Sequence, residues 1–140
     1  MKTVIKILIC TLFLISTTGS LLAKSVAIIT NKDNSAASIE KGALEKVYTG
    51  RDVDSFLPVD QSGAIKEVFY KEVTNKNIAQ INQLWGQIVF TGKGSKPPEL
   101  DGDAAVINWV KSNNKGLGYV EKSAAGADVK TLLTLEISAP

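Results

Sequence analysis

Apolar and polar positions alternate along the chain in a way that predicts strands separated by short helices. Residues 26–29, Val-Ala-Ile-Ile, form an unbroken apolar run that ends at the turn-prone segment 31–34. This run is typical of a strand buried on both faces, and we expect it at the centre of a sheet. Residues 129–137 alternate apolar side chains with Lys130, Thr134 and Glu136, which predicts a strand with one wetter face. Shorter strands are expected at 56–59 and 117–120.

Four segments carry apolar residues at helical spacing. The first is expected to follow Ser38, which can act as its N-cap, and to end before Gly50. The second covers 63–73, and the third covers 77–89 with Trp85 in the core. Either Asp101 or Asp103 opens the fourth, whose buried stripe is Val106, Trp109 and Val110. Residues 91–98 combine two glycines with two prolines and are expected to form a loop. Strands alternating with such helices predict an α/β domain with a mixed sheet of about four to five strands.

The junction at residues 57–65 is the most informative stretch. A short apolar run ends in the turn Asp60-Gln61-Ser62-Gly63, and an amphipathic helix follows at once. Such a junction points the unpaired N–H groups of the first helical turn at the sheet edge, where open α/β folds bind anions. Ser62 is equally well explained as an ordinary N-cap and Gly63 as an ordinary turn residue. N-caps are the more common case, and the residues leave both interpretations open.

The first 23 residues have the order of regions found in a secretory signal peptide. Lys2 and Lys6 precede an apolar run at 7–15, small and polar residues follow, and cleavage is expected after Ala23. The apolar run is shorter than the roughly 20 residues that a membrane span needs. The remaining residues, 24–140, are enough for one domain, expected in the periplasm or outside the cell. Without Lys2 and Lys6 the formal net charge falls from +2 to about zero, which does not favour a nucleic-acid or membrane-surface protein.

The residue types argue against an enzyme. The chain has no His, and its only Cys, Cys10, lies in the signal segment, so the commonest general base and the commonest thiol nucleophile are both missing. The segment 86–93 fails the nucleotide-binding pattern, because five residues separate Gly86 from Gly92 and Gly94 follows Lys93. The carboxylate pairs at 52–54 and 101–103 do not continue as calcium loops. No metal or other cofactor is expected.

Several segments together resemble the small phosphate-transport-type periplasmic solute-binding proteins. The matching stretches lie along nearly the whole of 24–140. They are Val47-Tyr48-Thr49-Gly50-Arg51, Leu57-Pro58-Val59-Asp60-Gln61, Phe69-Tyr70, Trp85, Phe90-Thr91-Gly92-Lys93-Gly94, Pro97-Pro98, Ala105-Val106 and Gly116-Leu117-Gly118-Tyr119-Val120. The resemblance implies one lobe-like domain of the type 2 periplasmic binding protein fold, with about four flanking helices.

The resemblance also implies a ligand class and a site. Phosphate or a related small oxyanion is the expected ligand, bound without catalysis, and an ABC permease or another envelope protein is the expected partner. Relatives bind phosphate with an arginine and a Ser-Gly-Thr turn, whereas this chain has Asp60 near the arginine position and Ala64 in place of the threonine. The predicted site residues are Asn31, Asp60, Gln61, Ser62 and Gly63, with Thr91, Gly92 and Lys93 as outer candidates.

Two functions therefore stay open from the sequence. The first is a secreted solute-binding protein for a small oxyanion. The second is an envelope protein-interaction module that kept the fold and lost ligand transport. Tyr119 and Gly118 are expected to be structural, holding the strand at 117–120.

Overall fold

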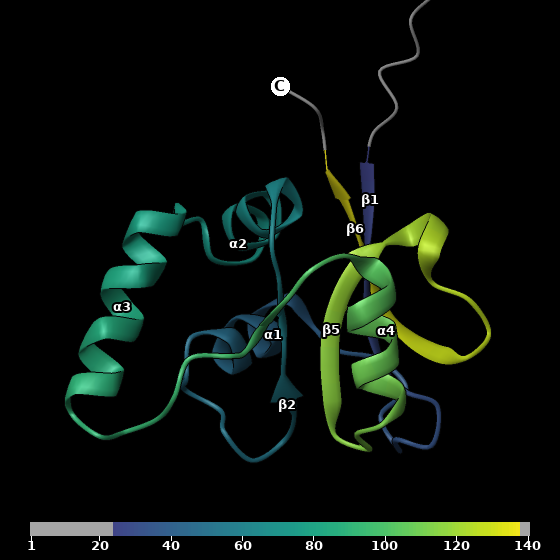
Figure 1. Cartoon of the computed structure of the whole chain (residues 1–140), viewed down its shortest axis with the longest axis horizontal. Helices are drawn as coiled ribbons and strands as arrows, with labels where there is room; N and C mark the ends of the chain where they lie inside the picture. Colours follow the sequence, from purple (N-terminus) through teal and green to yellow (C-terminus); the bar gives the residue numbers. More distant parts are fainter. Residues whose placement is uncertain (1–23, 138–140) are drawn as a thin grey trace, which may run out of the picture.

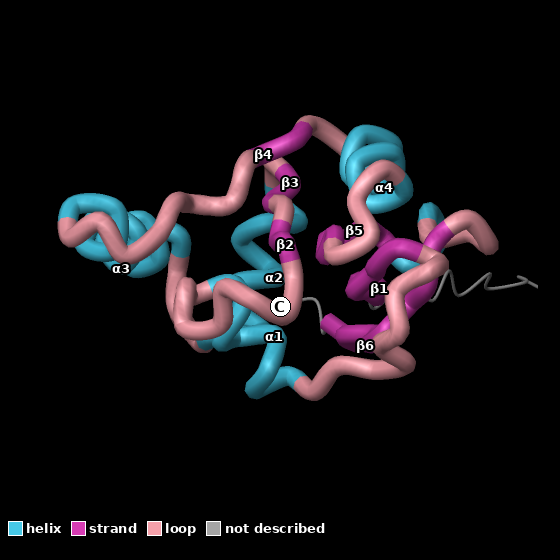
Figure 2. Tube along the Cα trace, turned by 90° about the horizontal axis from the view of Figure 1, so that it is seen from below, coloured by secondary structure: helices cyan, strands magenta, loops and turns pink. Residues whose placement is uncertain are grey.

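The computed structural model describes residues 24–137, and the predicted signal segment, residues 1–23 with Cys10, lies outside the described residues. A mixed sheet of four strands runs through the domain in the order β2 (Leu57–Pro58), β5 (Gly116–Glu121), β1 (Lys24–Asn31) and β6 (Val129–Ile137). Strand β1 pairs antiparallel with both neighbours, and β2 pairs parallel with β5. A separate parallel pair joins β3 (Asp60–Gln61) to β4 (Glu99–Leu100) (Figure 2).

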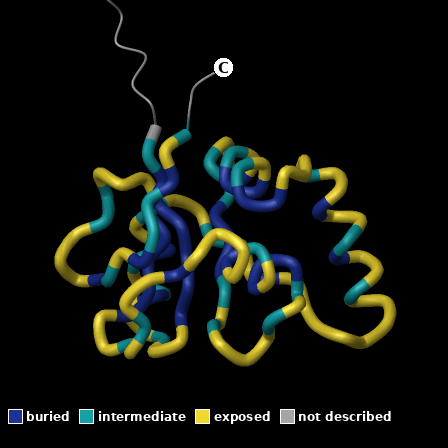
Figure 3. The backbone as a smooth tube through the Cα atoms, turned by 180° about the vertical axis from the view of Figure 1, so that it is seen from behind, coloured by how far each residue is buried: buried dark blue, intermediate teal, exposed yellow. Residues whose placement is uncertain are grey.

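Both faces of β1 are buried, as its sequence predicts. Val26 and Ile28 face a large core shared with α1 (Lys41–Tyr48), α2 (Ala64–Thr74) and α3 (Ile78–Phe90). Ala27 and Ile29 face a smaller core with α4 (Asp103–Lys111). Helices therefore cover both sides of the sheet (Figure 1). The short 3₁₀ helix η1 (Lys122–Ala124) follows β5. The chain is buried chiefly along the strands and on the inner helix faces (Figure 3).

Two of the predicted helix starts are wrong, and each error has a local cause. Helix α1 begins at Lys41 with Glu40 as its N-cap, so Ser38 does not cap it, because the Ile39 N–H donates to the Leu132 carbonyl of β6 and ties the preceding chain to the sheet. Helix α2 begins at Ala64 with Gly63 as its N-cap, and Ser62 makes no cap hydrogen bond. The Ser62 hydroxyl donates instead to Asp101.

The other two starts agree with the sequence. Asp103 is the first residue of α4. Helix α3 begins after Asn77, which closes a reciprocal capping box with Gln80 through hydrogen bonds of 2.9 and 3.0 Å.

Strand β6 has the predicted bounds but not the predicted alternation. A bulge shifts its register, so that Ile28 pairs with Leu133 and Ile29 pairs with Thr131. The extra residue, Leu132, turns into the core, whereas Thr131 is exposed. A bulge moves every following side chain to the other face, which simple alternation cannot anticipate.

Candidate functional site at the start of helix α2

The chain between β2 and α2 is held by backbone hydrogen bonds to two distant segments. The Val59 N–H donates to the Leu117 carbonyl of β5 at 2.9 Å. The N–H groups of Asp60 and Ser62 donate to the carbonyls of Pro98 and Leu100 at 2.8 and 2.9 Å. This pairing explains β3 and β4, and it fixes where α2 begins. The turn into the helix requires Gly63, whose φ of +93° is a conformation that side chains disfavour.

A cavity of about 260 Å³ lies at this junction. Its lining comes from β1, β3, the start of α2, the start of α4 and the end of β5, namely Ser25, Val26, Gln61, Ser62, Ala64, Ile65, Val68, Asp103 and Glu121. Within residues 24–137 the N–H groups of Ala64 and Ile65 have no hydrogen-bond acceptor. The first turn of an eleven-residue helix, with its partial positive charge, therefore lies at the cavity.

Two carboxylates line the same cavity, and a third lies beside it. Gln61 is buried, and its Nε2 donates to Asp103 Oδ1 at 2.9 Å and to the Tyr119 carbonyl at 3.0 Å. Asp103 and Glu121 belong to the lining, and Asp101 accepts the hydroxyl of Ser62. The side-chain donors of Gln61 and Ser62 are thus already engaged within the protein. The donors left for a ligand are the backbone N–H groups, and the acceptors beside them are carboxylates.

Asp60 belongs to the core instead of the cavity. Its carboxylate is fully buried and accepts the Tyr70 hydroxyl, 2.9 Å from each oxygen, and the Tyr119 hydroxyl at 3.0 Å. Burial raises the pKa of Asp60 above its usual range, while the hydrogen bond from Tyr70 acts in the opposite direction. Burial and the charge of Asp60 also raise the pKa of Tyr70 and of Tyr119. Both tyrosines therefore keep their protons and serve as hydrogen-bond donors to Asp60.

Tyr119 links this buried network to the cavity. Its hydroxyl oxygen accepts a hydrogen bond from the Gln61 N–H at 3.1 Å, and the same hydroxyl donates a hydrogen bond to Asp60. Its ring stacks on Phe69 of α2, with centroids 3.8 Å apart and planes inclined by 7°. The network thus fixes Gln61, which precedes the turn at Ser62 and Gly63.

The remaining predicted site residues lie elsewhere. Asn31 ends β1, and its Nδ2 donates to the Val110 and Lys111 carbonyls, so it closes the C-terminal end of α4. The cavity meets β1 at Ser25 and Val26, and an extended strand carries Asn31 roughly 20 Å further on. Thr91, Gly92 and Lys93 follow the C-terminal end of α3, and their backbone N–H groups satisfy its last carbonyls. Figure 1 shows that end of α3 well away from the start of α2.

Sequence reasoning missed Tyr70, Asp103 and Glu121, and it treated Tyr119 as purely structural. For the two tyrosines the sequence did offer a signal. A tyrosine at a core position has a buried hydroxyl, which needs a hydrogen-bond partner. Tyr48, Tyr70 and Tyr119 are all fully buried. No local sequence pattern predicts that Glu121 lines the cavity, because the pairing of β5 with β1 brings it there.

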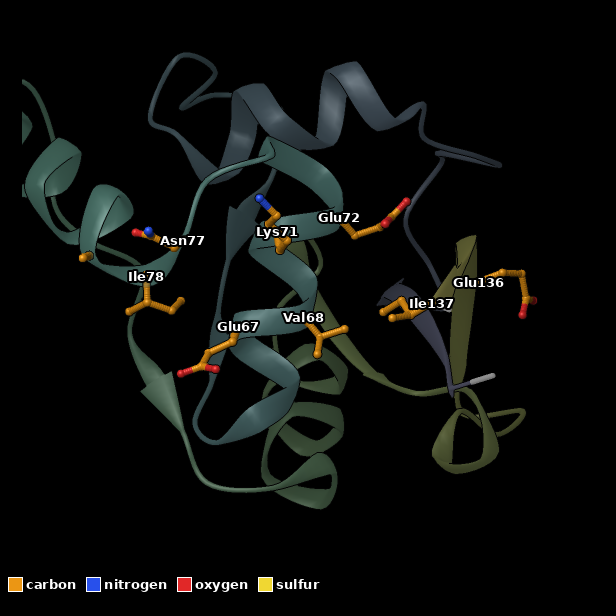
Figure 4. A pocket seen from close by; sticks show the side chains of 9 residues that line it. Glu67, Val68, Lys71, Glu72, Asn77, Ile78, Glu136 and Ile137 are labelled. Carbon is orange, nitrogen blue, oxygen red and sulfur yellow. The ribbon is translucent and has the colours of Figure 1, made fainter. Parts of the chain in front are cut away.

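A larger cavity of about 830 Å³ is a poorer anion site. It lies between α2, the start of α3 and the end of β6, and Figure 4 shows its lining. Glu67, Glu72 and Glu136 line it together with the single cation Lys71. It contains none of the predicted site residues. Within residues 24–137 there is also no cluster of His, Cys, Asp and Glu that could hold a metal ion.

Comparison with solved structures identifies the fold. A phosphate ABC transporter substrate-binding protein with bound phosphate, from Clostridium perfringens, matches with a TM-score of 0.63 and 16% identity. An ABC-type phosphate transport receptor from Vibrio cholerae matches with a TM-score of 0.59 and 12% identity. The chain has a single-lobe periplasmic binding protein fold. These matches cover 78% of the chain but only 44% and 45% of the two solved proteins.

This single-lobe fold confirms the predicted fold class, including the mixed sheet and the four helices. No protein-family model matches the sequence, and no curated protein matches it. The chain spans less than half the length of the solved proteins that it resembles. Among the helices of residues 24–137, none has the length and apolar character needed to cross a membrane.

Proposed function

We propose that this single-lobe domain is a solute-binding protein of the phosphate ABC transporter type, which binds phosphate or a related small oxyanion without catalysis. The observation that carries the proposal is the start of α2, where Ala64 and Ile65 line a cavity and their N–H groups have no acceptor within residues 24–137. A helix start of this kind is suited to an oxyanion. The fold likeness to a protein described with bound phosphate supports the same ligand class.

The carboxylates at the cavity bear on which oxyanion is bound. Asp103 and Glu121 repel a fully ionised oxyanion but accept a hydrogen bond from one that carries a proton. Phosphate and arsenate keep a proton near neutral pH, whereas sulfate does not. The cavity should therefore prefer phosphate and arsenate to sulfate.

Binding should be weak for a member of this class. No arginine lines the cavity, and the side chains of Gln61 and Ser62 already donate within the protein. A charge-assisted hydrogen bond from a backbone N–H contributes roughly 1.5–3 kcal/mol. Two such bonds, offset by the nearby carboxylates, are consistent with a dissociation constant nearer millimolar than micromolar.

Export and a transport partner are part of the same proposal. The order of regions in residues 1–23 supports signal cleavage after Ala23 and a periplasmic or secreted domain. The solved proteins of similar fold are described as components of ABC transporters, which supports an ABC permease as the partner. Those proteins are binding proteins, and the absence of His from the chain also argues against catalysis.

The test is calorimetric titration of residues 24–140 with phosphate, arsenate and sulfate, using a variant that removes one backbone donor. Ala64→Pro deletes the Ala64 N–H at the first helical position, where proline is well tolerated. We expect phosphate affinity to fall by tenfold or more. Lys41→Pro makes the same change at the first position of α1 and should leave affinity unchanged. Equal heats for sulfate and phosphate, or full affinity in Ala64→Pro, would contradict the proposed site.

A further inference from the structure

The surface of α3 and the loop after it differs in charge from the rest of the domain. Residues 78–98 contain no Asp or Glu, and their only charged side chains are Lys93 and Lys96. Helix α3 itself carries no charge over thirteen residues. An exposed helix usually has charged residues on its solvent face. The net charge of residues 24–140 is near zero, but this segment is basic and contains no acidic residue.

This segment also exposes apolar surface. Phe90 is 93% exposed and Val89 is 52% exposed at the C-terminal end of α3. Both line a shallow groove of about 620 Å³ together with Asn82, Trp85, Gly86 and Lys96. Nothing lies within 4 Å of a Cβ built on Gly86, so packing within the domain does not require a glycine there. The missing side chain leaves the groove open in the middle of the helix.

One cation is fixed at the edge of the groove. The Lys96 ammonium donates to Asn82 Oδ1 at 3.0 Å, which folds the loop back along the helix. Lys93 is exposed and follows Phe90 by three residues. The shallow groove thus brings exposed apolar side chains of α3 together with Lys96. Lys93 lies in the loop that directly follows α3, and α3 stands at one side of the domain (Figure 1).

We propose that this surface of α3 docks on an anionic phospholipid bilayer. Phe90 and Val89 enter the interfacial region, and Lys93 and Lys96 meet the phosphate headgroups. Charge complementarity favours an anionic bilayer over other partners. Segments that combine basic residues with exposed aromatic side chains bind anionic membrane surfaces through electrostatic attraction and apolar burial together. Docking of this kind is peripheral and reversible, and it uses no residue of the cavity at α2.

The test is flotation of residues 24–140 with vesicles at low salt. We expect binding to vesicles that contain phosphatidylglycerol and little binding to pure phosphatidylcholine, with loss of binding at high salt. Each lysine near an anionic surface contributes about 1 kcal/mol, so Lys93→Ala with Lys96→Ala should weaken binding roughly 30-fold. Phe90→Ser should weaken it at least tenfold, and Phe90→Trp should retain it.

A matched control distinguishes the contribution of this surface from that of the protein's net charge. Lys32→Ala with Lys122→Ala removes the same charge from exposed positions outside α3 and should leave binding within about twofold. Ala64→Pro should also bind vesicles normally, which distinguishes this proposal from the oxyanion site. The proposal is overturned if the wild-type protein does not float with anionic vesicles, or if the two lysine pairs have equal effects.

Discussion

The buried network around Asp60 makes a sharp prediction for Tyr70→Phe. The change removes one oxygen, the hydroxyl that lies 2.9 Å from each oxygen of the fully buried carboxylate. A hydrogen bond to a charged group contributes about 1.5–3 kcal/mol net. We therefore expect Tyr70→Phe to lower the free energy of unfolding by roughly this amount when Asp60 is ionised, and about pH 8 is chosen to favour the ionised form.

The loss should depend on pH with a defined sign. The pKa of Asp60 is raised in the folded protein, so this residue's contribution to stability is complete below its unfolded pKa and is lost as pH rises through the folded value. Removing Tyr70's hydroxyl raises the folded pKa further, because that bond favours the ionised form. At about pH 4, where protonation removes the charge, the cost should shrink to roughly 0.5–1.5 kcal/mol.

The assay is urea denaturation of wild type and variants at both pH values. Tyr48→Phe is the matched control, since Tyr48 is also fully buried and its hydroxyl donates to the neutral Val59 carbonyl at 2.9 Å. We expect a loss of about 0.5–1.5 kcal/mol that changes little with pH. A Tyr70→Phe loss that matches the Tyr48→Phe loss at both pH values would refute an ionised Asp60 held by Tyr70.

Three further outcomes are expected. Gly118→Ala should lower the free energy of unfolding by about 1–3 kcal/mol in equilibrium denaturation, because the added Cβ would lie 2.6 Å from Val106 Cγ1. Trp85→Ala should lower the free energy of unfolding by roughly 3–5 kcal/mol, and Trp109→Ala, at a half-buried position, should lower it by about 1–3 kcal/mol. Equal losses would contradict the difference in burial between the two tryptophans. Intact mass of the exported protein should correspond to a start at or near Lys24, and a membrane-bound product that retains residues 1–23 would contradict signal cleavage.

Much of the fold could be predicted from the sequence, because its elements are strongly patterned. The apolar run in β1 identified an interior strand, and the spacing in α3 placed Trp85 in the core, where it is 4% exposed. The two-residue strands β3 and β4 were not predicted as a pair. They depend on hydrogen bonds between Asp60 and Pro98 and between Ser62 and Leu100, which no local pattern encodes.

The candidate site was only partly predictable for the same reason. The junction at Gln61, Ser62 and Gly63 could be found because strand-to-helix turns have a local signature. Whether Asp60 faces the ligand or the core depends on Tyr70 and Tyr119, which are 10 and 59 residues away. Asn31 was predicted to belong to the site with the junction, yet the antiparallel pairing of β1 with β5 puts it at the other end of the sheet.

The central claim, an oxyanion held at the start of α2, is tested most directly by amide NMR of the ¹⁵N-labelled protein during a phosphate titration. We predict the largest and saturable shifts for the N–H groups of Ala64 and Ile65, and smaller ones during an equal sulfate titration. Shifts centred on residues 91–93, or none at millimolar phosphate, would contradict the claim.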